Sequence, residues 1–299
     1  MRTTDWLLLV FLSVLWGGAF FFIGVAVAEV PPLTLVAARV GIAALALLLV
    51  VWLLGYQLPQ TAAGWRVFVV QAIVSNVIPF SLITFGQTRI ASGLAAVLNA
   101  TTPLFTLLVM RVLAHEPLTL HKMAGVLLGI IGVAVLMGPE VAGANLSSIL
   151  GMMAVLGAAL SYGFSAYGMR RLREIPPLVS SAAQLLCATA LLLPMAAFAD
   201  HFWLQPLPSP AAIVAILALA LMSTALAFIV FFRISATAGP SNVMLVTLLI
   251  PVTATALGAA FLGEAMKATE IAGALIIASA LVIIDGRLLR RVVAVRATS

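Results

Sequence analysis

The stretch Glu29-Val30-Pro31-Pro32-Leu33 recurs later in the chain as Glu174-Ile175-Pro176-Pro177-Leu178. Downstream of each copy, further residues recur in the same order and at one constant spacing. They are Ser75, Phe80, Pro103, Glu116 and Gly125 in the first copy and Ser223, Phe228, Pro251, Glu264 and Gly273 in the second. This repetition predicts a chain built from two copies of one unit, which we place at residues 1–140 and 141–299.

The composition is typical of an integral membrane protein, with 64% apolar residues, 8% charged residues and a mean hydropathy of +1.24. A helix needs about 20 apolar residues to cross roughly 30 Å of hydrocarbon. Suitable runs lie near 6–28, 32–54, 65–86, 91–112, 119–138, 147–168, 178–199, 210–233, 240–262 and 269–286. The sequence therefore predicts an all-α membrane protein with ten transmembrane helices.

Each copy holds five of these runs, and five is an odd number. The second copy must then enter the membrane from the side opposite to the first, which makes the two five-helix repeats inverted. Two inverted repeats around a site near the bilayer midplane are typical of secondary transporters. We therefore expect a carrier of a small-molecule substrate.

The basic residues indicate the orientation of the chain, since Lys and Arg are retained on the cytoplasmic side of a membrane. With the N-terminus inside, Arg89 and Lys267 are the two basic loop residues that fall outside. Those that fall inside are Arg2, Arg66, Arg111, Lys122, Arg170, Arg171, Arg173, Arg233, Arg287, Arg290, Arg291 and Arg296. We expect a multi-pass protein of the bacterial inner membrane with both termini in the cytoplasm. The net charge of +6 reports this topology, and we expect no nucleic-acid partner.

The chain lacks the residues that several classes of protein need for their function. The single cysteine, Cys187, leaves no zinc spacing or redox pair, and the chain has no phosphate-binding loop. Paired aspartates, a zinc-binding helix motif and a serine with a nearby histidine are all missing from the apolar runs. We expect no metal, no cofactor and no enzymatic activity. A passive channel or a structural membrane protein stays open as the alternative class.

Proton coupling usually needs an ionisable relay within the membrane. Asp285 lies near the inner end of the last run, and His115, His121 and His201 lie in or beside loops. This pattern favours neutral or zwitterionic solutes carried by facilitated diffusion, while weakly coupled exchange through a loop group such as Glu264 stays open.

Motifs along nearly the whole chain resemble the EamA family of the drug/metabolite transporter superfamily. They are Leu15-Trp16-Gly17-Gly18-Ala19-Phe20, an arginine inside the second run, and Pro103-Leu104 followed by Glu116, Gly125 and Gly129. Overall the chain is most similar to the YddG-type amino-acid exporters of bacteria. The resemblance implies export of amino acids or similar small metabolites by alternating access, with broad specificity; a multidrug or other metabolite exporter of the same fold is the alternative.

The resemblance also implies an arrangement of the helices. Helices 1 to 4 and 6 to 9 would surround a central cavity, and helices 5 and 10 would buttress it. Small residues allow close packing of membrane helices. Helices 5 and 10 carry several, namely Gly125, Gly129, Gly132, Gly273, Ala274 and Ala278.

Polar residues inside the apolar runs are the candidates for substrate binding, because each is costly in lipid without a partner or water. These candidates are Ser75, Asn76, Asn99, Thr102, Ser161, Tyr162, Ser165, Ser223 and Thr247. A serine or threonine hydroxyl can instead bond the backbone of its own helix. The amides of Asn76 and Asn99 are harder to satisfy locally, so these two are the stronger candidates.

Arg39 is the basic residue that lies deepest inside a run. Its side chain could snorkel to the headgroups, bind a substrate carboxylate, or tie helix ends together through backbone carbonyls. Trp16, Phe20 and Phe80 could form an aromatic wall for an apolar side chain or simply pack in the core. Backbone broken near Pro79, Pro103 or Pro251 would add donors and acceptors to the site.

Glu116 and Glu264 recur at equivalent positions, which suggests a function. Each also stands just before a predicted helix, where a carboxylate is stabilised by the positive end of the helix dipole. We favour a structural cap for both.

Overall fold

The computed structural model describes residues 2–117, 119–143, 145–172, 174–238, 243 and 246–285. All regular structure within these ranges is helical. The elements are α1 (Thr3–Ala26), α2 (Pro32–Leu53), α3 (Ala62–Ala72), η1 (Ile73–Val77), α4 (Ile78–Gln87), α5 (Ser92–Asn99), α6 (Thr102–Leu113), α7 (Leu120–Ala142), α8 (Leu146–Gly168), η2 (Met169–Leu172), α9 (Pro177–Asp200), η3 (Phe202–Leu204), α10 (Pro210–Ala220), η4 (Leu221–Leu226), α11 (Ala227–Ala238), α13 (Val246–Leu262) and α14 (Ala268–Asp285).

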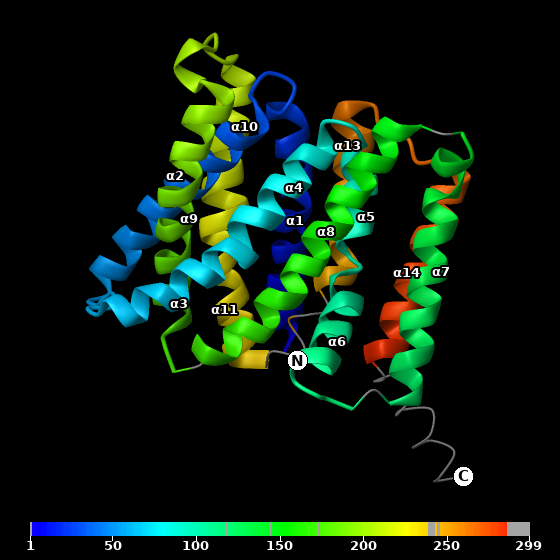
Figure 1. Cartoon of the computed structure of the whole chain (residues 1–299), viewed down its shortest axis with the longest axis horizontal. Coiled ribbons are helices and arrows are strands. Elements are labelled where there is room, and N and C mark those ends of the chain that lie inside the picture. The colour runs from blue at the N-terminus through cyan, green and yellow to red at the C-terminus, as the bar shows by residue number, and fades with distance from the viewer. Residues whose placement is uncertain are drawn as a thin grey trace.

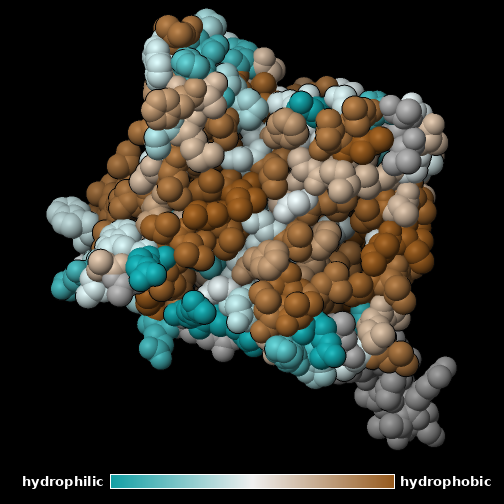
Figure 2. Space-filling model, in the orientation of Figure 1, coloured by the Kyte–Doolittle hydropathy of each residue, from teal (hydrophilic) through white to brown (hydrophobic). Residues whose placement is uncertain are grey.

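Eight helical stretches in the described residues are long and apolar enough to cross a membrane, counting α3-η1-α4, α5-α6 and α10-η4-α11 as one stretch each. Two shorter apolar helices follow, at Leu249–Leu262 and Ala268–Ile284. The all-helical membrane fold predicted from hydropathy is therefore confirmed. Apolar side chains cover the middle of the visible face, and polar atoms gather toward its two ends (Figure 2).

Three of the long stretches change their helical geometry midway. The third and eighth runs each contain a π-helical segment, η1 at Ile73–Val77 and η4 at Leu221–Leu226. The fourth run is broken between α5 and α6, where Pro103 lacks the N–H that would bond the carbonyl of Asn99. The hydroxyl of Thr102 donates to that carbonyl instead, at 2.7 Å. Pro103 thus breaks the fourth run, and the Thr102 side chain satisfies the freed carbonyl, whereas Pro251 lies inside the continuous helix α13.

Residues 1–140 and residues 141–299 pack against each other with the same pattern of helix contacts in both directions. The π-helical segment η4 packs against α1 and α2, and η1 packs in the same way against α8 and α9. Two further pairs join helices of corresponding position, α2 with α9 and α7 with α14. Helices α7 and α14 stand together at one edge of the molecule (Figure 1).

Glycines bring α7 and α14 into close contact. A Cβ atom added at Gly132 would lie 3.0 Å from the backbone nitrogen of Ile277, and one added at Gly273 would lie 2.9 Å from the carbonyl oxygen of Gly132. Gly125 faces Ala280 and Ile284 in the same interface, whereas Gly129 faces Leu104 of α6. The small residues of these two helices therefore serve the packing that their sequence pattern predicts.

This packing can be tested by adding one methyl group. Gly273→Ala should destabilise the protein by about 1–3 kcal/mol, because the added Cβ overlaps the backbone of α7. Gly138→Ala is the matched control, since an added Cβ there meets nothing within 4 Å. Thermal unfolding of both variants in one detergent should lower the midpoint for Gly273→Ala alone; equal midpoints would contradict this packing.

Candidate functional site

Arg39 lies in the interior of the molecule, where α2 meets η4 and α4. Its side chain is 6% exposed, and its Nε donates to the Oγ1 of Thr224 at 3.0 Å. The guanidinium carbon sits 3.8 Å from the centre of the Phe80 ring, a cation–π contact. Tyr162 of α8 is close enough to interact with it electrostatically. The buried guanidinium therefore does not snorkel to the headgroups, and no described backbone carbonyl accepts from it.

The π-helical segment η4 places the Thr224 hydroxyl beside this arginine. A π-helical turn lengthens the ladder of hydrogen bonds and leaves backbone carbonyls free for other donors. The Oγ1 of Thr224 donates to the carbonyl of Leu219 at 2.8 Å, and the Oγ of Ser161 donates to the carbonyl of Val74 at 2.8 Å. In η4 the hydroxyl that donates belongs to the segment itself. In η1 the carbonyl of the segment accepts from a hydroxyl of the facing helix α8.

A second polar cluster joins α3 and η1 to α8. The amide nitrogen of Gln71 lies 2.9 Å from the Oγ of Ser75, the Oγ of Ser165 and the carbonyl oxygen of Ser165. The two serine hydroxyls also bond each other. Ser75 and Ser165 come from different copies of the repeat, so this cluster joins the two halves of the chain.

Three predicted site residues keep polar groups without a partner in the part of the chain that the structure describes. Asn99 Oδ1 and Ser223 Oγ are buried and accept no hydrogen bond. No described residue bonds the amide of Asn76, whose side chain is 3% exposed within η1. Buried polar atoms without partners are uncommon in native proteins, so these three groups are the candidates for contact with a ligand or water.

The remaining predicted site residues have structural partners. The ring of Trp16 packs 5.4 Å from that of Phe231, centre to centre. Phe20 is 5% exposed in the hydrophobic core, and its carbonyl accepts from the Gln87 amide at 2.8 Å. The hydroxyl of Thr102 is occupied by its own helix. Thr247 is half-buried near the start of α13 and has a partner of its own.

At one end of the molecule, three carboxylates reach from one half of the chain to the start of a helix in the other. Glu29 accepts from the backbone N and the hydroxyl of Ser209, both at 2.7 Å. Asp200 accepts from the backbone N of Thr34 at 2.7 Å and from its hydroxyl at 2.8 Å. We call these two carboxylates and Glu264, with the helix starts that they bind, the carboxylate clasp.

Glu264 is the third member of the clasp, and it caps a different helix from the one that we expected. Its Oε1 accepts from the backbone N and the hydroxyl of Ser92, each at 2.9 Å, and its Oε2 accepts from Gly93 N at 3.3 Å. It therefore caps α5 in the first half and not α14, which follows it in sequence. The cap of α14 comes from Glu270, whose Oε2 accepts from Lys267 N at 2.9 Å.

Within the clasp, the bonds between Glu29 and Ser209 favour an ionised carboxylate. The backbone N of Ser209, and then its hydroxyl, lower the pKa of Glu29 by bonding its charged form. Because this pKa lies below that of a free carboxyl group, the bond contributes fully above the ordinary value and is lost as the pH falls through the lowered one.

At the opposite end of the molecule, two side-chain contacts join the halves among the residues that the structure describes. Glu116 pairs with Arg170 at 2.6 Å, the one ion pair found among the described residues, and no described backbone N–H at the start of α7 bonds its carboxylate. The Oδ1 of Asp5 accepts from Thr237 at 3.0 Å. Helix α1 begins and α14 ends at this end of the molecule (Figure 1).

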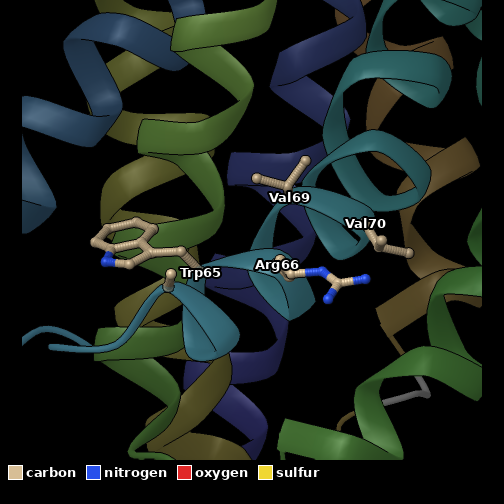
Figure 3. Close-up of a pocket in the computed structure, with 5 residues that line it drawn as sticks. Trp65, Arg66, Val69 and Val70 are labelled. Atoms are coloured by element: carbon tan, nitrogen blue, oxygen red, sulfur yellow. The ribbon is translucent and has the colours of Figure 1, made fainter.

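An open depression on the outer side of α3 is separate from all of these groups. It is lined by Ala62, Trp65, Arg66, Val69 and Val70. In Figure 3 the Trp65 ring and the Arg66 side chain point in opposite directions. The Trp65 indole donates to the carbonyl of Pro59 at 2.9 Å, which anchors the start of the helix. None of the predicted site residues lines this depression.

Two further partners in the interior are Gln71 and Thr224. Both are polar residues inside apolar runs, and that polarity marks them for a place at the site. Their importance comes from contacts with Ser165 and Arg39, which are far away in sequence.

Comparisons with known proteins place the chain among transporters. The model of the EamA-like transporter family matches residues 4–138 and 149–285. The uncharacterized inner membrane transporter YedA of Escherichia coli strain K12 is 27% identical over 87% of this chain and 83% of its own. A probable amino-acid metabolite efflux pump of Salmonella typhimurium is 27% identical over 95% of both chains. One crystal structure shares the fold, with a TM-score of 0.67 and 21% identity over 98% of this chain and 99% of that one.

Proposed function

Because the chain belongs to the EamA-like transporter family, we propose that it exports amino acids or similar small metabolites across the bacterial inner membrane by alternating access. The single observation that carries this proposal is the set of buried polar groups around Arg39, where the two halves of a membrane protein meet. Such groups are costly in lipid and usually mark a solute pathway.

The exchange of contacts between the halves supports two inverted repeats at residues 1–140 and 141–299. Segment η4 packs on the first two helices of the first repeat, and η1 packs on the first two helices of the second. Pairs α2–α9 and α7–α14 join corresponding helices, as expected around a pseudo-two-fold axis. Ten spans, with α13 and α14 as the last two, complete this arrangement.

The carboxylate clasp supports a gate at one end of the pathway. Its members, Glu29, Asp200 and Glu264, hold the halves together at the end that we assign to the periplasm. The other end is joined by the exposed Arg170–Glu116 pair and by Asp5 with Thr237. We assign the structure to a state closed toward the periplasm, because three carboxylates join the halves at that end and two of them, Asp200 and Glu264, make part-buried bonds.

Amino acids are the substrates that we favour. An amino acid presents a carboxylate and an ammonium group, which need donors such as Arg39 and acceptors such as Asn99 Oδ1 inside the protein. The similarity to a protein named as a probable amino-acid metabolite efflux pump points the same way. Few charged anchors should give broad specificity, because a missing methylene changes affinity by only about 1–3 kcal/mol.

Uptake of a panel of radiolabelled amino acids into proteoliposomes tests this function. We expect saturable uptake of several neutral amino acids that compete with one another for one site. Empty liposomes are the control. Uptake of drug-like cations alone would contradict the amino-acid assignment and leave the transporter fold in place.

The topology has its own test. We predict that both termini and the loop with Arg170 and Arg171 face the cytoplasm, because the basic residues gather at that end. Arg173 and the arginines after Asp285 belong to the same prediction but lie outside the described residues. A C-terminal reporter that is active only in the cytoplasm should give signal; activity of a periplasm-specific reporter at the same position would contradict the topology.

A further inference from the structure

Arg39 has more hydrogen-bond donors than the protein satisfies. A guanidinium carries five N–H groups and no acceptor. Its Nε uses one of them, on Thr224, and no described residue accepts from Nη1 or Nη2. No described carboxylate pairs with it either, since the ion pair that the structure contains joins Arg170 and Glu116. A side chain that is 6% exposed is therefore charged and mostly unpartnered.

A buried charge without a counter-ion is expensive, and proteins normally pair it. The ring of Phe80 covers one face of the guanidinium at 3.8 Å, which offsets part of this cost. The remaining donors lie in one plane at the end of the fork, the arrangement that binds the two oxygens of a carboxylate. The missing partner is an anion of that shape.

Thr224 fixes the direction in which this fork points. Its hydroxyl donates to the Leu219 carbonyl at 2.8 Å, so its proton is already used and its lone pairs face the Nε of Arg39. Arg39 thus donates to Thr224 and Thr224 donates to Leu219, and neither bond can be reversed, because the guanidinium cannot accept and the carbonyl cannot donate. The Nε edge of the guanidinium is occupied, and the Nη1–Nη2 end stays free for a ligand.

We propose that Arg39 binds the carboxylate of the transported solute end-on, with Phe80 as its platform and Thr224 as its positioning residue. This proposal rests on the proposed transport function and names its substrate class, which is solutes with a free carboxylate. Solutes of the same size that lack the carboxylate are rejected, whether they are neutral amides or amines. Arg39 does not contact the amino group of the solute, so a carboxylate without an amino group still binds.

Competition against radiolabelled L-leucine uptake into proteoliposomes tests the substrate class. The competitors differ from leucine by one group each: 4-methylpentanoate lacks the amine, isoamylamine lacks the carboxylate, and leucinamide carries a neutral amide in its place. We expect isoamylamine and leucinamide to compete at least about 10- to 100-fold more weakly than leucine, the loss expected for a charge-assisted bond of about 1.5–3 kcal/mol. 4-Methylpentanoate should compete measurably.

Variants test whether the preference for solutes with a carboxylate depends on Arg39. Arg39→Gln should abolish the preference for carboxylates. Arg89→Gln is the matched control, because Arg89 makes the same kinds of contact, with Phe85 at 3.9 Å and Thr88 at 2.6 Å, in a loop away from the site. It should keep the wild-type preference.

Thr224 needs a readout that a merely structural role would not move. Thr224→Val should raise the half-saturating leucine concentration about 5- to 10-fold at an unchanged maximal rate, an effect of the size of one hydrogen bond. Thr224→Ser keeps the hydroxyl and should restore the wild-type value. An equal loss of maximal rate in both variants would overturn the positioning role.

A binding measurement separates this proposal from the transport function. Thermal stabilisation of the detergent-solubilised protein by 4-methylpentanoate, present in wild type and lost in Arg39→Gln, would support the carboxylate site even if no amino acid were transported. If leucine is transported but isoamylamine and leucinamide compete as well as leucine does, the carboxylate site is wrong and the transport function stands. If Arg39→Gln does not fold, Arg39→Lys keeps the charge but loses the planar fork, so the advantage of leucine over leucinamide should shrink; an unchanged advantage would contradict end-on binding by the guanidinium.

Discussion

Glu264→Gln should open the periplasmic end of the molecule and make its interior react faster with thiol reagents from that side. The Glu264 carboxylate accepts three bonds from the first turn of α5, across the boundary between the halves. Bonds to a charged group contribute about 1.5–3 kcal/mol, and glutamine loses that charge. The equilibrium between closed and open states should therefore shift about 10- to 100-fold toward the open state.

A cysteine at Ala95 reports this opening, in a background in which Cys187 is replaced by alanine. Ala95 is fully buried on α5, behind the clasp, and α5 packs on α13 of the other half. A membrane-impermeant methanethiosulfonate added from the periplasmic side should modify it faster in Glu264→Gln by the same factor. Glu270→Gln is the matched control, because Glu270 caps its own helix within one half. Equal rates in the two variants would show that the clasp does not hold this gate.

Asn99→Leu should reduce transport about 10- to 100-fold without loss of stability. Asn99 Oδ1 is buried without a partner, and an unsatisfied buried group costs about 1–3 kcal/mol in the empty protein. Leucine has a similar shape and no such group, so the unfolding midpoint should stay the same or rise. The substrate loses an acceptor for its ammonium group, which accounts for the reduced transport.

Leucine uptake and thermal unfolding, measured on the same preparation, check this pair of effects. Thr106→Val is the control, since the Thr106 hydroxyl bonds the Thr102 carbonyl within one helix and should leave transport unchanged. A destabilised Asn99→Leu variant with normal transport would mean that this amide is structural.

The fold was largely predictable because lipid imposes a simple rule on sequence. A spanning helix must be apolar for about 20 residues, so the ends of the predicted runs agree with the helices to within a few residues in most cases. The π-helical segments were not predictable. Ile73–Val77 is mostly apolar, with Ser75 and Asn76 as its polar residues, and it packs against α8 and α9, which are far away in sequence.

The candidate site was predictable in its members but not in their pairing. Polarity inside an apolar run pointed to Arg39, Asn76 and Asn99, whereas the partners of Arg39 come from Thr224 and Phe80, far along the chain. The same reason explains the error at Glu264. A carboxylate before a helix predicts a local cap, and only the packing of the halves brings it to α5.

Counterflow tests the central claim, that one interior site is exposed to the two sides of the membrane in turn. Proteoliposomes are loaded with unlabelled leucine and diluted into buffer that contains a trace of radiolabelled leucine. An alternating carrier should accumulate the label transiently above its equilibrium level, because outward flow of unlabelled solute returns the site to bind labelled solute. Uptake that rises to equilibrium without an overshoot, and that does not saturate with concentration, would contradict the account and indicate a passive channel.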